Sequence, residues 1–207
     1  MIAAVVPAAG GSTRMGRPKM LLPLAGRTVL ATVVARLLEA PLDRVVVVLG
    51  REAGEVRARA GLPDDPRVAV VENPGWRDGL SSSVVRGLHA CPEAGAVLVA
   101  LGDQPGVEPE VVRRLVEAWR AGSRLAVPVR GGRTGHPALF DRSLRDELLA
   151  LTGDVGARAV LIRHWDEAAR VDAPIPADLD REEDYRAFVE GRPPSGPRGL
   201  EVPPARD

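Results

Sequence analysis

Residues 44–49 read Arg-Val-Val-Val-Val-Leu, and this run decides the fold class. Successive apolar side chains, most of them β-branched, are typical of a parallel strand that helices cover on both faces. The segments before and after it, residues 28–38 and 51–60, repeat their apolar side chains at helical spacing. A buried strand between two helices predicts an α/β protein.

The alternation of strands and helices continues along most of the chain. Short apolar runs predict further strands at residues 2–7, 68–71, 96–101, 125–129, 138–140 and 169–171. Helical spacing predicts further helices at residues 81–90, 109–120, 143–151, 156–163 and 182–190. Helices between parallel strands imply right-handed crossovers. We therefore expect a three-layer α/β/α sandwich around a mostly parallel, Rossmann-like sheet.

The composition is that of an ordinary globular protein of 207 residues, 45% of them hydrophobic. Its 28 basic and 28 acidic residues balance, which removes the bulk electrostatic argument for a nucleic-acid or acidic-membrane partner. A single cysteine, Cys91, excludes an internal disulfide framework. No apolar run reaches the ~18 residues of a membrane span, and no basic leader precedes the first strand, so we expect a cytoplasmic protein.

Residues 1–190 are expected to form one domain, because ~100–200 residues is the usual domain size. Residues 191–207 are dense in Pro, Gly and Arg and show no periodicity. We expect this segment to be a disordered tail with no share in the fold.

A glycine-rich loop follows the first predicted strand, at the sheet edge where ligands of such folds bind. Residues 8–19 read Ala-Ala-Gly-Gly-Ser-Thr-Arg-Met-Gly-Arg-Pro-Lys. Gly10, Gly11 and Gly16 allow backbone amides to approach an anion closely. Their spacing does not match the Gly-x-Gly-x-x-Gly fingerprint, and the Arg-Pro after Gly16 excludes a P-loop. The loop predicts either an anion site of another type or a turn without function.

Two cations in this loop favour the anion site. Arg14 can hold phosphate oxygens with two hydrogen bonds, whereas Lys19 supplies a compact, movable charge. Lys19 is the only lysine in the chain, among 27 arginines, which indicates a position that requires an ammonium group. Such a pair suits a nucleoside triphosphate whose α-phosphate gains charge as it is attacked.

The loop resembles the signature of the molybdenum cofactor nucleotidyltransferases, and within them most of all the cytidylyltransferases, which attach CMP to molybdopterin. The matching residues are Ala8-Ala9-Gly10-Gly11-Ser12-x-Arg14-Met15-Gly16-x-x-Lys19-x-Leu21. The resemblance extends over roughly residues 2–190 and implies the fold of the nucleotide-diphospho-sugar transferases. It implies that Arg14 and Lys19 are catalytic and that the nucleotide is bound by Ala8, Ala9, Gly10, Gly11, Arg14 and Lys19.

Later segments match the same family at the ends of predicted strands. Gly79 and Ser83 then correspond to nucleobase contacts, although serines at this place can also simply cap a helix. Asp103, in Gly-Asp-Gln-Pro, corresponds to a catalytic Mg²⁺ ligand, and a carboxylate is a ligand that this hard cation prefers. Asp180 corresponds to the second Mg²⁺ contact. For both aspartates the alternative is an acidic side chain on a solvated loop.

Three more residues, His136, Asp154 and Arg158, resemble positions of the cytidylyltransferase branch. They are candidates for binding the second substrate. A histidine beside a proline is also often only a hydrogen-bonded turn residue.

The resemblance implies Mg²⁺-dependent transfer of CMP from CTP to the terminal phosphate of molybdopterin, with release of pyrophosphate. Within this chemistry, GTP could replace CTP, and a sugar phosphate or an isoprenoid phosphate could be the acceptor. Outside it, the chain could be an oxidoreductase, as some relatives are described, or a non-catalytic maturation factor for a molybdenum enzyme. A molybdenum hydroxylase apoenzyme would be a protein partner, while neither nucleic acid nor membrane is expected.

Overall fold

The computed structural model describes residues 1–10, 18–192 and 199–202. Its strands are β1 (Ile2–Ala8), β2 (Pro23–Leu24), β3 (Arg27–Thr28), β4 (Arg44–Leu49), β5 (Val68–Glu72), β6 (Ala96–Val99), β7 (Leu125–Arg130), β8 (Arg133–Thr134), β9 (Ala138–Asp141), β10 (Ala169–Asp172) and β11 (Leu200–Glu201). Its α-helices are α1 (Val29–Leu38), α2 (Ala53–Arg59), α3 (Leu80–His89), α4 (Pro109–Arg120), α5 (Arg145–Leu149), α6 (Arg158–Arg163) and α7 (Glu182–Val189). None of these helices is both long and apolar enough to cross a membrane.

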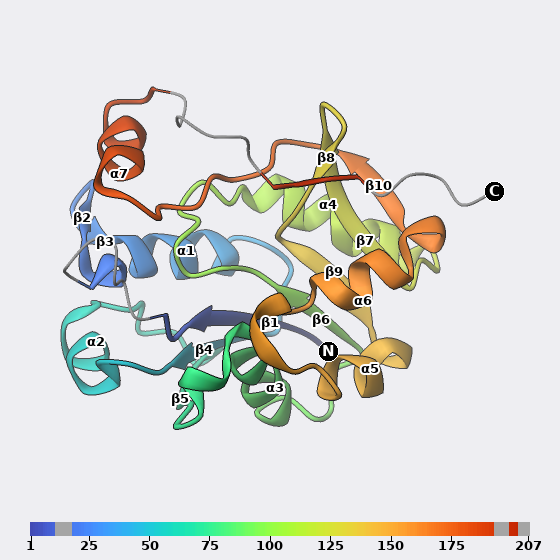
Figure 1. The fold of residues 1–207 in the computed structure, drawn as a ribbon, viewed down its shortest axis with the longest axis horizontal. Helices are drawn as coiled ribbons and strands as arrows, with labels where there is room; N and C mark the ends of the chain where they lie inside the picture. The colour runs from blue at the N-terminus through green and yellow to red at the C-terminus, as the bar shows by residue number, and fades with distance from the viewer. Residues whose placement is uncertain (11–17, 193–198, 203–207) are drawn as a thin grey trace.

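A mixed sheet forms the middle of the molecule, with the strand order β11-β8-β7-β9-β6-β1-β4-β5 and β10 paired to β7 (Figure 1). Strands β5, β4, β1 and β6 run parallel, and Val5 of β1 lies between Val46 and Val99. Strand β9 is antiparallel to both β6 and β7. The predicted architecture of mostly parallel strands flanked by helices is confirmed.

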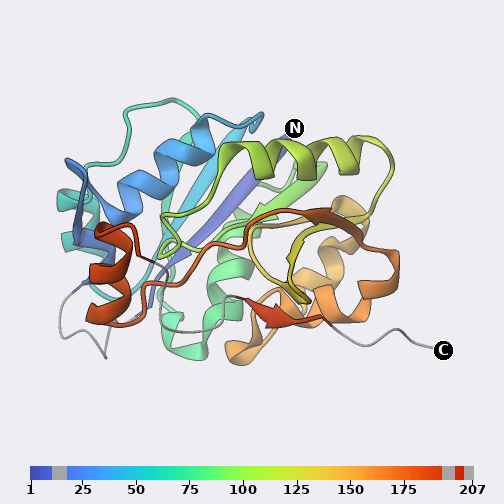
Figure 2. The ribbon, with the colours of Figure 1, turned by 90° about the horizontal axis from the view of Figure 1, so that it is seen from above.

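Helices cover both faces of the sheet because the strands are apolar on both sides (Figure 2). All seven residues of β1 are buried. Val6 belongs to the core cluster that contains residues of α1 and α4, whereas its neighbour Val5 belongs to the cluster with residues of α3 and α6. The continuous apolar run at residues 44–49 divides in the same alternating way, as a strand with two buried faces must.

The strand order reverses beside β1, and this places the site. From β1 the chain passes to β4 and β5 on one side and then returns to β6 on the other. In doubly wound sheets, ligands bind at the carboxyl ends of the strands that flank such a reversal. Lys19, which follows β1 in the chain, and Asp103, which follows β6, meet there.

The C-terminal segment departs from the sequence-based expectation. Leu200–Glu201 form β11, which pairs antiparallel with β8, and the Val202 amide donates to the Gly132 carbonyl at 3.0 Å. The prediction that residues 191–207 have no share in the fold is therefore wrong at residues 199–202. Without β11, strand β8 would have unpaired backbone groups at the sheet edge. A two-residue strand such as β11 can pair with these groups, but it is too short to leave a periodic pattern in the sequence.

Candidate active site

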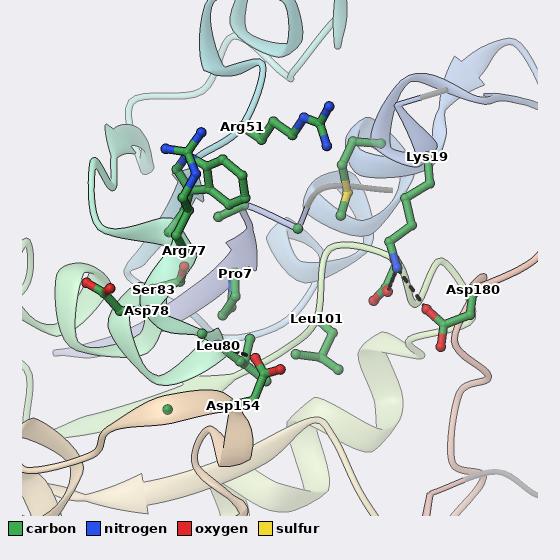
Figure 3. A pocket seen from close by; sticks show the side chains of 17 residues that line it. Pro7, Lys19, Arg51, Arg77, Asp78, Leu80, Ser83, Leu101, Asp154 and Asp180 are labelled. Atoms are coloured by element: carbon green, nitrogen blue, oxygen red, sulfur yellow. Dashed lines mark hydrogen bonds and ion pairs between the residues drawn. The ribbon is translucent and has the colours of Figure 1, made fainter. Parts of the chain in front are cut away.

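A cavity of about 960 Å³ opens at the carboxyl ends of the central strands (Figure 3). Its walls come from the loops after β1, β4, β5 and β6, from the start of α3, and from two segments of the C-terminal third. The lining residues are Pro7, Ala9, Gly10, Lys19, Met20, Arg51, Trp76, Arg77, Asp78, Gly79, Leu80, Ser83, Leu101, Asp103, Gly153, Asp154 and Asp180. A volume of this size can accommodate a nucleotide together with a second substrate.

The Lys19 ammonium lies between two carboxylates on one side of this cavity (Figure 3). It donates to Oδ2 of Asp103 and, at 3.0 Å, to Oδ1 of Asp180. The side chains of Lys19 and Asp103 are 12% and 13% exposed, and that of Asp180 is 46% exposed. Burial by itself lowers the pKa of Lys19, but the charges and hydrogen bonds of the two aspartates outweigh it and raise that pKa to about 12. Lys19 is therefore a permanent cation.

Asp103 is held in place by the tight packing of the glycine before it. The Gly102 amide donates to the Pro7 carbonyl at 3.1 Å, which joins the ends of β1 and β6. A Cβ on Gly102 would lie 3.0 Å from the Ala8 Cβ and 3.2 Å from the Met20 sulfur. Only glycine allows this approach without displacing its neighbours, and the approach brings Asp103 to Lys19.

Asp180 reaches the cavity from the segment before α7. The Leu179 amide donates to the Asp103 carbonyl at 3.1 Å, and the Leu179 side chain is buried with Leu22 and Val29. The Arg181 amide donates to Oδ2 of Asp184 at 3.0 Å, so that α7 begins on an internal acidic partner although arginine is a poor helix cap. Asp180 is thus fixed from both sides.

The neighbouring Asp178 carboxyl is affected by the charges of Asp103, Asp180 and Lys19. The residue is exposed, yet loss of solvation, followed by the charge of Asp103, raises the pKa of its carboxyl to about 6. A hydrogen bond from Gln104 opposes this shift. Asp178 is therefore close enough to Lys19, Asp103 and Asp180 to be affected by their charges, although only Asp103 and Asp180 contact the ammonium.

The opposite side of the cavity is built around Asn73, a buried amide. It donates to Oγ of Ser82 at 2.8 Å and to Oγ of Ser83 at 3.0 Å, and it accepts from the Gly75 amide at 3.0 Å. The serine run therefore fixes the wall of the cavity. None of the serines at 81, 82 and 83 is the N-cap of α3, because that position is Gly79.

Gly79 is required by its backbone and by a close contact. Its φ is +96°, and a Cβ there would lie 2.5 Å from the carbonyl carbon of Gly153. The contact brings Asp154 to the start of α3, where its Oδ1 accepts from the Leu80 amide at 3.1 Å (Figure 3). Asp154 thus caps a helix from another segment.

The structure brings most of the predicted site residues together. Those that line this cavity are Ala9, Gly10, Lys19, Gly79, Ser83, Asp103, Asp154 and Asp180. Ala8 is buried in β1 behind them. Gly11 and Arg14 lie outside the described residues.

Two of the three second-substrate candidates do not line the cavity. Nδ1 of His136 lies 3.3 Å from the Val99 carbonyl, and loss of solvation lowers the pKa of its imidazole. Arg158 is exposed at the start of α6. Among the three candidates, only Asp154 faces the proposed reaction space.

Sequence reasoning missed the cations Arg51 and Arg77. Arg51 follows β4, and the Arg77 guanidinium stacks on the Trp76 ring at 4.5 Å from its centroid (Figure 3). The position of Arg51 directly behind a buried strand was a usable signal, because the carboxyl ends of the strands carry the site. Arg77 lies in a short 3₁₀ helix, Trp76–Asp78, further from the end of β5, and its position gave a weaker signal.

Comparison with known proteins decides the family. Residues 4–168 match the model of the MobA-like NTP transferase domain. The chain belongs to the MobA-like NTP transferase family. The predicted family, the fold and the nucleotidyltransferase class of enzyme are thereby confirmed.

Two curated relatives of this MobA-like chain are named for different activities. It is 39% identical to the nicotine blue oxidoreductase of Paenarthrobacter nicotinovorans over 169 residues, which cover 77% of this chain and 81% of the relative. It is 26% identical to the molybdenum cofactor cytidylyltransferase of Escherichia coli over 182 residues, which cover 87% and 92% of the two chains.

A solved structure supports the same family. Rv0371c from Mycobacterium tuberculosis matches with a TM-score of 0.79 and 34% identity, over 91% of this chain and 97% of that one. A second crystal structure of Rv0371c is a complex with manganese, and it matches with a TM-score of 0.74 and 33% identity over 91% and 98% of the chains.

The carboxylates of this MobA-like site fit a hard divalent cation. Asp103 and Asp180 present oxygen atoms to one point, where the Lys19 ammonium already shows that a positive charge is stable. In the part of the chain that the structure describes, no group of three or more His, Cys, Asp or Glu side chains could enclose a metal. A pair of carboxylates completed by phosphate oxygens and water is the usual arrangement for Mg²⁺.

Proposed function

We propose that this protein transfers CMP from CTP to the terminal phosphate of molybdopterin and releases pyrophosphate. The observation that carries the proposal is the meeting of Lys19 with Asp103 and Asp180, which stand 84 and 161 positions away in the chain. These groups suit polyphosphate chemistry, and the cytidylyltransferase relative favours CTP and molybdopterin as the substrates.

The proposed reaction is an in-line displacement without a covalent enzyme intermediate. An oxygen of the acceptor phosphate forms a bond to the α-phosphorus of CTP, and the bond from that phosphorus to the bridging oxygen of the β-phosphate breaks. The electron pair of the broken bond leaves with pyrophosphate. Because both substrates are anions, the protein must hold them together and neutralise charge in the transition state.

The residues divide this work between the two sides of the cavity. Lys19 would stabilise the α-phosphate as it becomes five-coordinate, as a cation preorganised by its two acidic neighbours. The backbone at Gly10 is open toward the cavity, since a Cβ there would meet nothing within 4 Å. Gly10 would cradle the triphosphate there, together with the predicted contributions of Gly11 and Arg14. Gly79 and Ser83 would contact the base.

Asp103 and Asp180 would hold Mg²⁺. The cation, when bound, would supply charge neutralisation at the phosphate oxygens. The manganese complex of Rv0371c supports a divalent cation in this family. Of the residues proposed for the second substrate, Asp154 is the one that lines the cavity, where it lies beside Gly79 and accepts from the Leu80 amide.

A second candidate function is an oxidoreductase activity. It is favoured by the 39% identity to nicotine blue oxidoreductase, which exceeds the 26% identity to the cytidylyltransferase. An oxidoreductase needs a redox cofactor, and the first loop lacks the Gly-x-Gly-x-x-Gly spacing of dinucleotide-binding folds. Replacement of CTP by GTP, or of molybdopterin by another phosphorylated acceptor, would leave the proposed chemistry unchanged.

Measurement of pyrophosphate release distinguishes these functions. We expect release from CTP that requires both Mg²⁺ and molybdopterin, with CMP recovered on the acceptor. Release of pyrophosphate with GTP, or with another phosphate acceptor, would show that the substrates differ from those proposed while the reaction is the same. Absence of pyrophosphate with every nucleotide and acceptor, together with oxidation of NADH or NADPH by a pigment substrate, would establish the oxidoreductase instead.

A further inference from the structure

A short strap, defined as residues 173–181, crosses the loop that follows β6. Two hydrogen bonds join them. The first is the backbone contact from the Leu179 amide to the Asp103 carbonyl at 3.1 Å. The second is a side-chain contact, in which Nε2 of Gln104 donates to Oδ1 of Asp178 at 2.7 Å. In the chain, Gln104 directly follows Asp103, and Asp178 stands two residues before Asp180.

Gln104 is a buried amide next to the proposed metal site, with 5% of its surface exposed. Its own backbone is fixed, because its amide donates to the Leu101 carbonyl at 3.2 Å and its carbonyl accepts from the Val107 amide at 3.1 Å. A buried amide without a partner is costly, so the side chain has a strong preference for its acceptor. The strap supplies that acceptor.

The order of residues along the strap allows the hydrogen bond between Gln104 and Asp178 to restrain Asp180. Leu179 turns into the apolar cluster with Leu22 and Val29, and the acids at 178 and 180 flank it. The Gln104 contact fixes the residue before Leu179, while Lys19 contacts the residue after it. Loss of the Gln104 contact would leave the strap before Asp180 anchored through Leu179 alone, and the Asp180 side chain is already 46% exposed.

We propose that Gln104 is a positioning residue, which acts through Asp178 to keep the Asp180 carboxylate opposite Asp103. Resting on the proposed function, this inference adds that the cation site depends on an amide that does not itself face the cavity. Partners behind metal ligands commonly change metal affinity by about 10–100-fold when they are removed.

The test is the dissociation constant of Mn²⁺, measured by electron paramagnetic resonance on the full chain. Gln104→Met preserves side-chain volume and removes the donor. We expect it to weaken Mn²⁺ binding by about 10-fold. Asp178→Ala should weaken binding as well. In the Asp178→Ala background, Gln104→Met should add less than about 2-fold, because a residue that acts through Asp178 has nothing left to act on. The charge lost at position 178 is common to both members of this comparison and cancels.

Two further variants serve as a control and as a substitute for Gln104→Met. Asp141→Ala is the matched control, since Asp141 accepts from Trp119 at 2.8 Å but pairs with Ala96, at the opposite end of β6 from Asp103. It should lower stability and leave Mn²⁺ binding unchanged. If Gln104→Met fails to fold, Gln104→Asn replaces it, because its amide is one methylene too short to reach Asp178.

The outcomes separate this inference from the proposed function. Unchanged Mn²⁺ affinity in the Gln104 variant, or losses that multiply in the double variant, would overturn the positioning role alone. Unchanged affinity in Asp103→Asn would overturn the metal site itself, and the inference with it.

Discussion

Lys19 provides an ammonium group where every other basic position of the chain has a guanidinium. An ammonium is a compact charge that can meet two carboxylates at a single atom, whereas the planar arginine fork pairs best with one carboxylate. The contacts of Nζ with Asp103 and Asp180 use this property. The arrangement explains why arginine would not be an equivalent residue here.

Lys19→Met should reduce turnover by about 10²-fold or more, since it removes the charge that we propose to stabilise the transition state. The pKa of about 12 keeps Lys19 protonated in any ordinary assay, so this loss should not vary with pH between 6 and about 9. Steady-state pyrophosphate release measures it.

Arg27→Met is the control for Lys19→Met, because it also removes one positive charge but from an exposed position outside the cavity. It should retain full turnover. A near-normal rate for Lys19→Met would contradict the catalytic role.

Gly79→Ala tests the close approach of two loops. Both Gly79 and Gly122 have φ values in the region that favours glycine, +96° and +104°, but only Gly79 has a backbone within 3 Å of an added Cβ. We expect Gly122→Ala to lower the free energy of unfolding by about 1–3 kcal/mol through backbone strain. Gly79→Ala should cost about 1–3 kcal/mol more through overlap with Gly153. Urea denaturation compares them, and equal losses would contradict the required contact.

At the scale of elements, Asp141 ties α4 to the end of β9. It accepts from the Trp119 indole and from the Ser143 amide, each at 2.8 Å. Burial alone would raise the pKa of Asp141, but these hydrogen bonds outweigh it and hold the pKa below its usual value. A lowered pKa means that the folded state gains stability from the charged form above about pH 4 and loses it as the pH falls through the lowered value.

Asp141→Asn should therefore be less stable than the natural chain at pH 7, by about 1 kcal/mol, with a difference that shrinks below about pH 4. Chemical denaturation at a series of pH values measures this. A difference that stays constant down to pH 3 would show that the charge of Asp141 does not contribute.

The sequence predicts the long elements well and the short ones poorly. The buried strands β1, β4 and β7 and the helices α1 and α4 have strong apolar patterns, and the structure confirms each within one or two residues. The two-residue strands, in contrast, exist only because a partner edge is nearby. No local pattern could predict β11, which pairs with β8 across the sheet edge.

Lys19 and Asp103 could be predicted because they follow buried strands, whereas Asp180 was indicated by the family resemblance alone. Lys19, Asp103 and Asp180 do lie together in the structure, while their catalytic and metal-binding roles stay predictions. The contact of Gln104 with Asp178 and the position of Arg77 depend on how loops pack. Gln104 and Asp178 are far apart in the chain, and Arg77 lies in a short 3₁₀ helix. Neither arrangement produces a periodic sequence pattern.

At the scale of the whole molecule, ligand binding should stabilise the fold. We expect CTP with Mg²⁺, at 100 times its dissociation constant, to add about 2.7 kcal/mol of stability. This corresponds to a rise of roughly 5–10 °C in Tm for a domain of this size. A thermal-shift series with CTP, GTP, ATP and UTP measures the preference, and Asp103→Asn is the control. No shift with any of the four would contradict a nucleotide site.

The distance between Lys19 and Asp180 along the chain has a consequence for biosynthesis. All strands of the sheet except β11 have been translated by residue 172, before Asp180 leaves the ribosome. A nascent chain can thus gather its central strands while half of its carboxylate pair is still missing. The proposed site would then be completed only late in translation, when Asp180 contacts Lys19, which was made 161 positions earlier.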